Sequence, residues 1–262
     1  MSGAKNFCCS EAGIFQHPWP ELTEVFLLSR SPGLLVSGNR SARGEFRLAL
    51  VQKCADSFAE FCAGGDISGF SAAGGDAPAY VAALARRAHD SITILARMQK
   101  PVLALVNGPA AGFGMSLALV GDLVLAARSA NFTTAYGGIG LTPDGGMSWV
   151  LPRLVGLRRA QDMLLGNRRV GSEEAERIGL ITRLVEDEVL AAEGAMLAAQ
   201  LAAKPVAAFS AARALLLASY GSSLEDQLDR EAATIGLAAA GPEFREGIGA
   251  FLAKRKQDFS GI

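Results

Sequence analysis

Two glycine-rich stretches of this 262-residue chain could bring bare backbone N–H groups against a ligand. The first is FCAGGDI at Phe61–Ile67, and the second is NGPAAGFG at Asn107–Gly114. The second stretch reads as a strand end, a flexible turn and the start of a helix, where amides lack intrahelical partners and carry the positive end of the helix dipole. Two such amides facing one point can hold a carbonyl oxygen as it becomes an oxyanion. Taken alone, glycine-rich turns of this kind more often serve as tight turns without a ligand.

The elements around these stretches follow one another in the order of an α/β domain. Apolar residues at helical spacing predict a helix over Ala79–Gln99 that ends before Pro101. Residues 101–108 and 123–130 read as buried strands, and 112–122 reads as a glycine-led turn entering a helix. The sequence therefore predicts buried strands that carry the second stretch into the interior of the domain.

The rest of the chain is predicted to be mostly helical. Residues 147–166 read as two short helices around Pro152, and Ser172 is expected to cap a helix over 171–180. A short strand is expected at Ile181–Asp187, followed by helices from Glu188 onward. We expect a core over residues 1–195, with 1–55 atypical, and a helical C-terminal region over 196–262.

The N-terminal part is harder to interpret. Residues 24–29 resemble a strand, 31–44 resemble a loop, and Gly44–Phe61 has helical spacing. Between Cys54 and Phe61 there is no run of β-branched residues that would predict a strand leading into the first glycine-rich stretch.

Composition excludes several functions. The net charge of −1 offers no basic excess for nucleic-acid binding. The most apolar region, 101–127, is interrupted by Asn107 and Asp122, so it reads as buried strand and helix and not as a membrane span. The cysteines, which are Cys8, Cys9, Cys54 and Cys62, follow neither a zinc pattern nor a disulfide framework. With no secretory signal at Met1, a cytoplasmic location is expected.

Five segments of the chain, taken in their order along the sequence, resemble the crotonase family, the enoyl-CoA hydratase/isomerase superfamily. They are FCAGGDI, KPVLALVNGPAAGFG, GLTPDGG, WVLPRLVGLRRA and FREGIGAFLAKRKQDFSG. The resemblance runs from about Asp56 to the C-terminus and implies a crotonase-like ββα spiral core with a helical C-terminal trimerisation region. It further implies an acyl-CoA thioester substrate whose coenzyme A arrives as part of the substrate, no metal or other cofactor, and a homotrimer or a dimer of trimers.

The resemblance also implies the site residues. The N–H groups of Gly65 and Phe113 would form the oxyanion hole for the thioester carbonyl. Three residues of the first stretch, Ala63, Asp66 and Ile67, would line the coenzyme A segment. Two further residues, Gly112 and Tyr136, would also contact the substrate.

The two glutamates of family hydratases are missing here. Ser116 and Tyr136 occupy the matching positions, and neither is a good general base near neutral pH. Asp144 of TPDGG is the remaining carboxylate, at a position where some family members use an aspartate. An isomerase with Asp144 as its single acid/base is therefore favoured over a two-glutamate hydratase. A Pro-Asp-Gly turn in which Asp144 merely caps the next helix is the structural alternative.

Two other functions stay open. Asp144 with His89 would match a hydrolytic dehalogenase or thioesterase branch, although a single helical histidine is usually a surface or packing residue. A non-catalytic acyl-CoA-binding protein would fit the missing glutamates and the atypical N-terminus. Among the remaining residues, Trp149, Leu151, Leu154 and Leu157 are expected in the core or a subunit interface, and Arg153, Arg158 and Arg159 as solvated helix charges.

Overall fold

The main sheet of the computed structural model has the strand order β1-β2-β3-β4-β6-β9. The structure describes residues 25–27, 34–37, 49–53 and 61–262, with side chains from residue 61 onward. The strands of this sheet are β1 (Val25–Leu27), β2 (Leu34–Ser37), β3 (Ala49–Lys53), β4 (Val102–Val106), β6 (Leu123–Ala127) and β9 (Arg183–Val185). From β3 to β9 the neighbours run parallel, whereas β1, β2 and β3 pair antiparallel.

A smaller sheet holds the two glycine-rich stretches together. It consists of β5 (Pro109–Ala111), β7 (Asn131–Thr133) and β8 (Arg169–Gly171). β5 follows β4 after a two-residue turn, so the small sheet starts where the buried centre of the main sheet ends. Cys62 forms a parallel bridge with Ala110, which adds the first stretch to the edge of β5.

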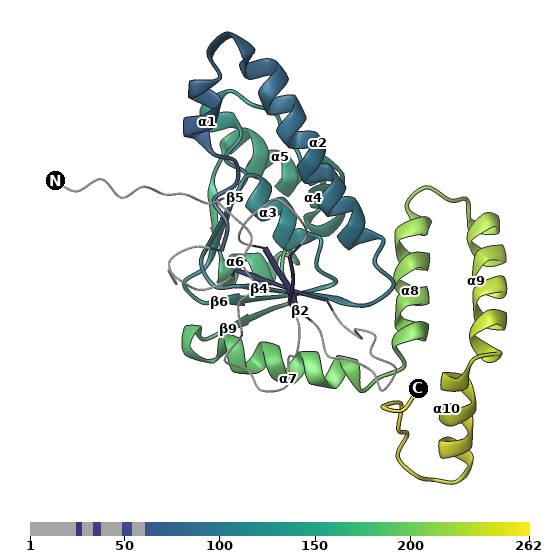
Figure 1. Ribbon diagram of the computed structural model, residues 1–262. Helices are drawn as coiled ribbons and strands as arrows, with labels where there is room; N and C mark the ends of the chain where they lie inside the picture. Colours follow the sequence, from purple (N-terminus) through teal and green to yellow (C-terminus); the bar gives the residue numbers. More distant parts are fainter. Residues whose placement is uncertain (1–24, 28–33, 38–48, 54–60) are drawn as a thin grey trace.

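Helices cover both faces of the main sheet (Figure 1). On one face α7 lies along β4 and β6, so closely that a Cβ on Gly194 would lie 2.3 Å from Leu105 Cδ1. On the other face α3 contacts β4 and α4. The helices of the core are α1 (Ile67–Ala72), α2 (Ala77–Ala96), α3 (Phe113–Leu119), α4 (Met147–Val155), α5 (Leu157–Gly166), α6 (Ser172–Arg177) and α7 (Leu190–Ala202), with 3₁₀ turns at Gly74–Asp76, Gly137–Ile139 and Asp187–Val189.

The last three helices form an arm that projects from this core (Figure 1). They are α8 (Val206–Ser219), α9 (Leu224–Ala239) and α10 (Pro242–Leu252). α9 has no buried residue, and large apolar side chains of the arm are exposed, Leu228, Ile235, Leu237 and Phe251 among them. The predicted division after residue 195 falls within α7 and stays a prediction.

Within the described residues, no single helix is long and apolar enough to cross a membrane. The bent pair Asp187–Ala202 and Val206–Ser219, which meet at 101°, passes this test of length and composition only when its two halves are taken together.

The helix predicted over Gly44–Phe61 is wrong at Ala49–Lys53, which forms β3. The predicted loop over 31–44 is likewise wrong at Leu34–Ser37, which forms β2. β3 pairs with β2 and β4, and these pairings with residues elsewhere in the chain cannot be seen in the local spacing of five residues. A strand beside β4 that precedes the first glycine-rich stretch is therefore present. His17, Cys8, Cys9 and Cys54 lie outside the described residues.

Two local predictions in the second half also need correction. The break between the two helices of 147–166 lies at Gly156, whose φ of +81° suits glycine, and Pro152 stays inside α4. The Ser172 side chain does not cap α6. Its buried hydroxyl is shared between the carbonyl oxygens of Ala127 and Ala130, at 2.7 and 2.9 Å. Ser172 therefore ties α6 to the end of β6.

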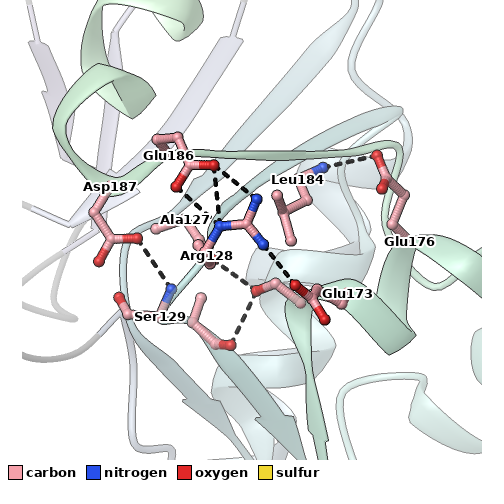
Figure 2. A network of polar contacts seen from close by, with 10 residues as sticks. Ala127, Arg128, Ser129, Glu173, Glu176, Leu184, Glu186 and Asp187 are labelled. Carbon is pink, nitrogen blue, oxygen red and sulfur yellow. Dashed lines mark hydrogen bonds and ion pairs between the residues drawn. The ribbon is translucent and has the colours of Figure 1, made fainter.

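An ion-pair network at the end of β6 holds the same junction together (Figure 2). The guanidinium of Arg128 donates to both carboxylate oxygens of Glu186 at 2.7–3.0 Å and to Glu173 at 2.6 Å. These bonds from Arg128 hold the pKa of Glu186 below its usual value. Because all three side chains are exposed, the network contributes little stability. It links the ends of β6 and β9 to the start of α6.

A more deeply buried ion pair joins the arm to the core. Arg213 of α8 donates to the Asp122 carboxylate at 2.5 and 2.7 Å, and its remaining donors reach the carbonyl oxygens of Leu95, Ala96 and Met98. Asp122 also accepts from the N–H of Val102 at 2.7 Å. The arm is thus attached where α2 ends and β4 begins.

Arg213→Met is expected to destabilise the protein by about 1–3 kcal/mol at pH 7, because it leaves the partly exposed Asp122 carboxylate without its partner. Burial raises the pKa of Asp122 even though Val102 and Arg213 lower it. A carboxyl whose pKa is higher in the folded than in the unfolded state makes folding less favourable as the pH rises between the two values. Losing Arg213 widens this interval, so the loss should be smaller at pH 4 than at pH 7.

Urea unfolding of the Arg213→Met variant at both pH values would measure this difference. The matched control is Arg158→Met, which removes an exposed arginine of α5 and should change the free energy of unfolding by less than about 0.5 kcal/mol. An equal loss for Arg213→Met at pH 4 and pH 7 would contradict the role assigned to Asp122.

Candidate active site

The two glycine-rich stretches lie side by side along the edge of the small sheet. The N–H of Cys62 donates to the carbonyl of Pro109 at 3.2 Å, and the N–H of Ala111 donates to the carbonyl of Cys62 at 2.9 Å. Residues 61–65 are therefore held against residues 109–113 through their backbones. This is the arrangement that the two candidate N–H donors require.

Glycine is needed for this close approach at two positions. A Cβ on Gly114 would lie 2.0 Å from the carbonyl oxygen of Cys62, which is far inside van der Waals contact. Gly64 has φ +90°, and a Cβ there would lie 2.9 Å from the carbonyl oxygen of Ala111. Both glycines thus set how near the two segments can come.

The N–H groups of Gly65 and Phe113 have no hydrogen-bond acceptor among the residues that the structure describes. Phe113 is the first residue of α3, so its N–H belongs to the free amides of a helix start. Gly65 is exposed and Phe113 is half-buried, so both amides can be reached from solvent. These two donors remain available for a ligand oxygen, as the sequence predicts for an oxyanion hole.

Asp144 is joined to the two residues that stand where hydratases carry glutamates. The hydroxyl of Tyr136 donates to Asp144 Oδ1 at 2.7 Å. The hydroxyl of Ser116 donates to the backbone carbonyl of Asp144 at 3.0 Å and lies 3.3 Å from the Tyr136 hydroxyl. Three positions far apart in the sequence thus form one hydrogen-bonded cluster.

The Asp144 side chain does not cap α4, whose N-cap residue is Gly146. Only its backbone carbonyl takes part in the turn, by accepting from the N–H of Met147 at 3.0 Å. The carboxylate is half-buried and is oriented by Tyr136. The structural alternative, an aspartate that serves only as a helix cap, is therefore not what the contacts show.

Close packing connects Asp144 to the start of α3. A Cβ on the next residue, Gly145, would lie 2.6 Å from Ser116 Cβ and 2.9 Å from Phe113 Cδ2. Gly145 also has φ +61°, a conformation that side chains rarely adopt. The loop that carries the carboxylate consequently lies against the residue that supplies the second candidate N–H donor.

The phenol of Tyr136 is a hydrogen-bond donor in this site and not a base. Burial, and after it the neighbouring Asp144, raises the pKa of Tyr136 well above its usual value, despite the opposing hydrogen bond with Ser116. Tyr136 therefore stays protonated throughout the physiological pH range. Ser116 is almost fully buried and already bonded, so neither residue supplies a second base.

The other predicted site residues surround the two stretches. Gly112 precedes α3 with φ +53°, and its N–H donates to the carbonyl of Thr133 at 3.0 Å. Ala63, Asp66 and Ile67 are all exposed. Asp66 caps α1 by accepting from the N–H and hydroxyl of Ser68, and the hydroxyl bond holds the pKa of Asp66 below its ordinary value. Contact with coenzyme A remains a prediction for these residues.

His89 does not join the cluster. It is exposed on α2, and no hydrogen bond or ion pair links it to Asp144 in the described part of the chain. The geometry therefore brings together Asp144, Tyr136 and Ser116 beside Phe113, and leaves His89 outside.

The sequence did not reveal that several residues of α4 and the arm lie beside the candidate site. Trp149, expected in the core or an interface, is 43% exposed and lines a cavity next to Ser116. Arg153, expected as a solvated charge, stacks over Trp149 and over Tyr220 of α8–α9. The four-residue spacing of Trp149 and Arg153 could have predicted that their side chains meet on one face of a helix. The lone Arg213 within an apolar helix could have predicted a buried charge with a partner elsewhere in the chain.

Residues 55–261 match the sequence model of the enoyl-CoA hydratase/isomerase family, and this chain belongs to that family. It is 39% identical to the 1,2-epoxyphenylacetyl-CoA isomerase of Escherichia coli over 202 residues, 77% of each chain. It is 34% identical to 4-chlorobenzoyl coenzyme A dehalogenase-1 of Arthrobacter sp. over 63% of this chain and 60% of the relative.

Solved structures agree with this assignment. The fold matches an enoyl-CoA hydratase from Polaromonas sp. with a TM-score of 0.77 and 32% identity, over 81% of this chain and 82% of that one. The α/β fold with its C-terminal helices is therefore that of the crotonase structures, as predicted, and the protein is a crotonase-family acyl-CoA enzyme.

Proposed function

We propose that this protein is an enoyl-CoA isomerase that shifts a carbon–carbon double bond in an acyl-CoA thioester. Asp144 is the single acid/base, and the N–H groups of Gly65 and Phe113 hold the thioester oxygen. The observation that carries the proposal is the hydrogen-bonded cluster of Asp144, Tyr136 and Ser116, in which Asp144 is the one carboxylate.

The reaction needs no second carboxylate. With a 3-enoyl thioester, the Asp144 carboxylate takes a proton from C2, and the C2–H electron pair moves toward the carbonyl to form a dienolate. The oxygen that gains charge accepts hydrogen bonds from the Gly65 and Phe113 amides. The protonated Asp144 then returns the proton to C4, which leaves the double bond between C2 and C3. Tyr136 orients the carboxylate in both steps through its 2.7 Å hydrogen bond.

Water addition is less well supported by the same cluster. Activation of a water and protonation of the adjacent carbon usually call for two titratable groups near neutral pH. Tyr136 stays protonated and Ser116 is buried and bonded, so within the described cluster Asp144 is the one group that could serve. The similarity to a 1,2-epoxyphenylacetyl-CoA isomerase also favours isomerisation.

A panel of 2-enoyl- and 3-enoyl-CoA thioesters tests the proposal, with double-bond migration and water addition followed separately. We expect migration with the purified wild-type protein and little or no hydration. Hydration that exceeds migration across the panel would contradict the proposal. Substrate binding without any turnover would favour the non-catalytic alternative instead. The His89→Ala variant serves as a control for the dehalogenase alternative, because an isomerase of this kind should keep its rate.

We also propose that the exposed apolar side chains of α8, α9 and α10 form a subunit interface, in keeping with the trimer that the family resemblance implies. Sedimentation equilibrium would measure the assembly. A mass near three or six times the chain mass of 27.2 kDa is expected, and a stable monomer would contradict the proposal.

A further inference from the structure

A cavity of about 220 Å³ opens next to the Asp144 cluster, between α3, α4 and α8. Ser116 and Gly145 line it on the side of the cluster, and both contact the residues of the candidate site. Its other walls come from α4 and from the arm, with Trp149, Leu154, Leu216 and Tyr220 among the lining residues. The cavity thus lies between residues that flank the Asp144 cluster and the arm.

The lining is almost entirely apolar. Of the lining residues that the structure describes, only Asp122 and Arg213 are charged, and they form a partly buried ion pair with each other. Four of the five N–H donors of Arg213 are engaged by Asp122 and by three carbonyl oxygens. A charged group inside the cavity would therefore lose its hydration without finding a matched partner.

An aromatic pair, Trp149 of α4 and Tyr220 of the arm, forms one part of the cavity wall. The rings of Trp149 and Tyr220 meet edge to face, with centroids 5.0 Å apart and an interplanar angle of 74°. The Arg153 guanidinium lies 4.4 Å from the Trp149 centroid and 5.0 Å from that of Tyr220. It also donates to the carbonyl of Trp149 at 2.6 Å. Cation–π and edge-to-face contacts together hold both rings in one orientation.

We propose that this cavity takes the acyl tail of the substrate, and that the Trp149–Tyr220 pair sets the largest tail that fits. The ligand class is an uncharged, apolar acyl group. An apolar cavity of about 150 Å³ holds a benzene-sized molecule, so this one accepts a six-membered ring with a few further carbons or a chain of about eight carbons. Placing the reacting carbons at Asp144 depends on the proposed function. The expected size and polarity of the acyl tail depend only on the volume and lining of the cavity.

Binding of saturated acyl-CoA thioesters tests this without any reaction. Isothermal titration of butanoyl- to octadecanoyl-CoA with wild-type protein should show about threefold to fourfold tighter binding per added CH₂. The plateau is expected near twelve carbons, because about four carbons at the Asp144 end precede the roughly eight that the cavity holds. Tyr220→Ala should move that plateau to longer chains by several carbons. Tyr220→Trp should move the plateau to shorter chains. This second variant keeps an aromatic ring at the position, so it tests the proposal even if Tyr220→Ala weakens the attachment of α8.

The control variant is Leu165→Ala, which removes an apolar side chain that is 85% exposed on α5 and does not line the cavity. Its plateau should equal that of the wild type. An ω-carboxyoctanoyl-CoA should bind at least about tenfold more weakly than octanoyl-CoA, because its terminal charge loses hydration in the cavity. Unchanged plateaus in both Tyr220 variants, or equal affinity for the ω-carboxylate, would overturn the proposal. Saturated thioesters cannot isomerise, so failure of the proposed reaction would leave these readouts unaffected.

Discussion

Asp144→Asn is expected to lower the rate of double-bond migration by about 100-fold to 10,000-fold, because it removes the carboxylate that takes and returns the proton. The amide keeps the shape of the side chain and can still accept the hydrogen bond from Tyr136, which measures 2.7 Å. The fold and the thioester site should consequently persist. Steady-state kinetics with a 3-enoyl-CoA, together with titration of a saturated acyl-CoA, would separate lost chemistry from lost binding.

Tyr136→Phe is the matched comparison for this variant. It leaves the carboxylate in place and removes only the hydroxyl that orients it, so a smaller loss of about tenfold in kcat is expected, the size of one hydrogen bond to a charged group. KM should change little, since Tyr136 acts through Asp144. If Asp144→Asn kept more than about a tenth of the wild-type rate, or lost less than Tyr136→Phe, Asp144 would not be the acid/base.

Gly114→Ala is expected to cause the second large effect, through the oxyanion hole. The new Cβ would lie 2.0 Å from the carbonyl oxygen of Cys62 and 2.7 Å from Cys62 Cβ, so the two backbone segments must move apart. Those segments carry the N–H groups of Gly65 and Phe113. Losing one oxyanion donor typically costs about 100-fold to 1,000-fold in kcat. The same strain should lower the melting temperature.

Gly236→Ala provides the control for this substitution. Gly236 is exposed in the interior of α9, and no atom lies within 4 Å of the Cβ that alanine would add. Because alanine favours a helix over glycine, this variant should be more stable by about 0.5–1 kcal/mol with unchanged kcat. Wild-type kcat and an unchanged melting temperature in Gly114→Ala would show that the close approach of residues 61–65 and 109–113 is unimportant for catalysis.

Prediction from the sequence worked best for helices and strands whose local residue pattern matches their burial in the fold. Strand β4 is an uninterrupted apolar run that is buried throughout, and α2 ends just before a proline, as expected. The glycine-rich stretches also carried their own physical reason, since Gly114 lies where no side chain fits against Cys62. These features follow from sterics and burial that act over a few residues, so a single sequence suffices to find them.

The sequence-based predictions failed where contacts with residues far along the chain determine the local structure. Strand β3 was predicted to be a helix because its pairing with β4 is absent from local spacing. The Trp149–Tyr220 contact and the Arg213–Asp122 pair depend on how the arm docks on the core, so local patterns could at most mark one partner of each pair. The hydrogen bond from Tyr136 to Asp144 was likewise invisible, although both residues were already named as site candidates.

The central claim is that one carboxylate moves the proton while two backbone amides hold the enolate. Proton NMR of a 3-enoyl-CoA in D₂O would follow exchange at C2 and appearance of the 2-enoyl product in the same tube, for wild type and Asp144→Asn. The account predicts the 2-enoyl product with the wild type, with or without exchange at C2 because Asp144 can return the same proton to C4. It predicts neither event with the variant, although the variant still binds the thioester. Exchange at C2 that continues in Asp144→Asn would contradict it, because another group would then be removing the proton.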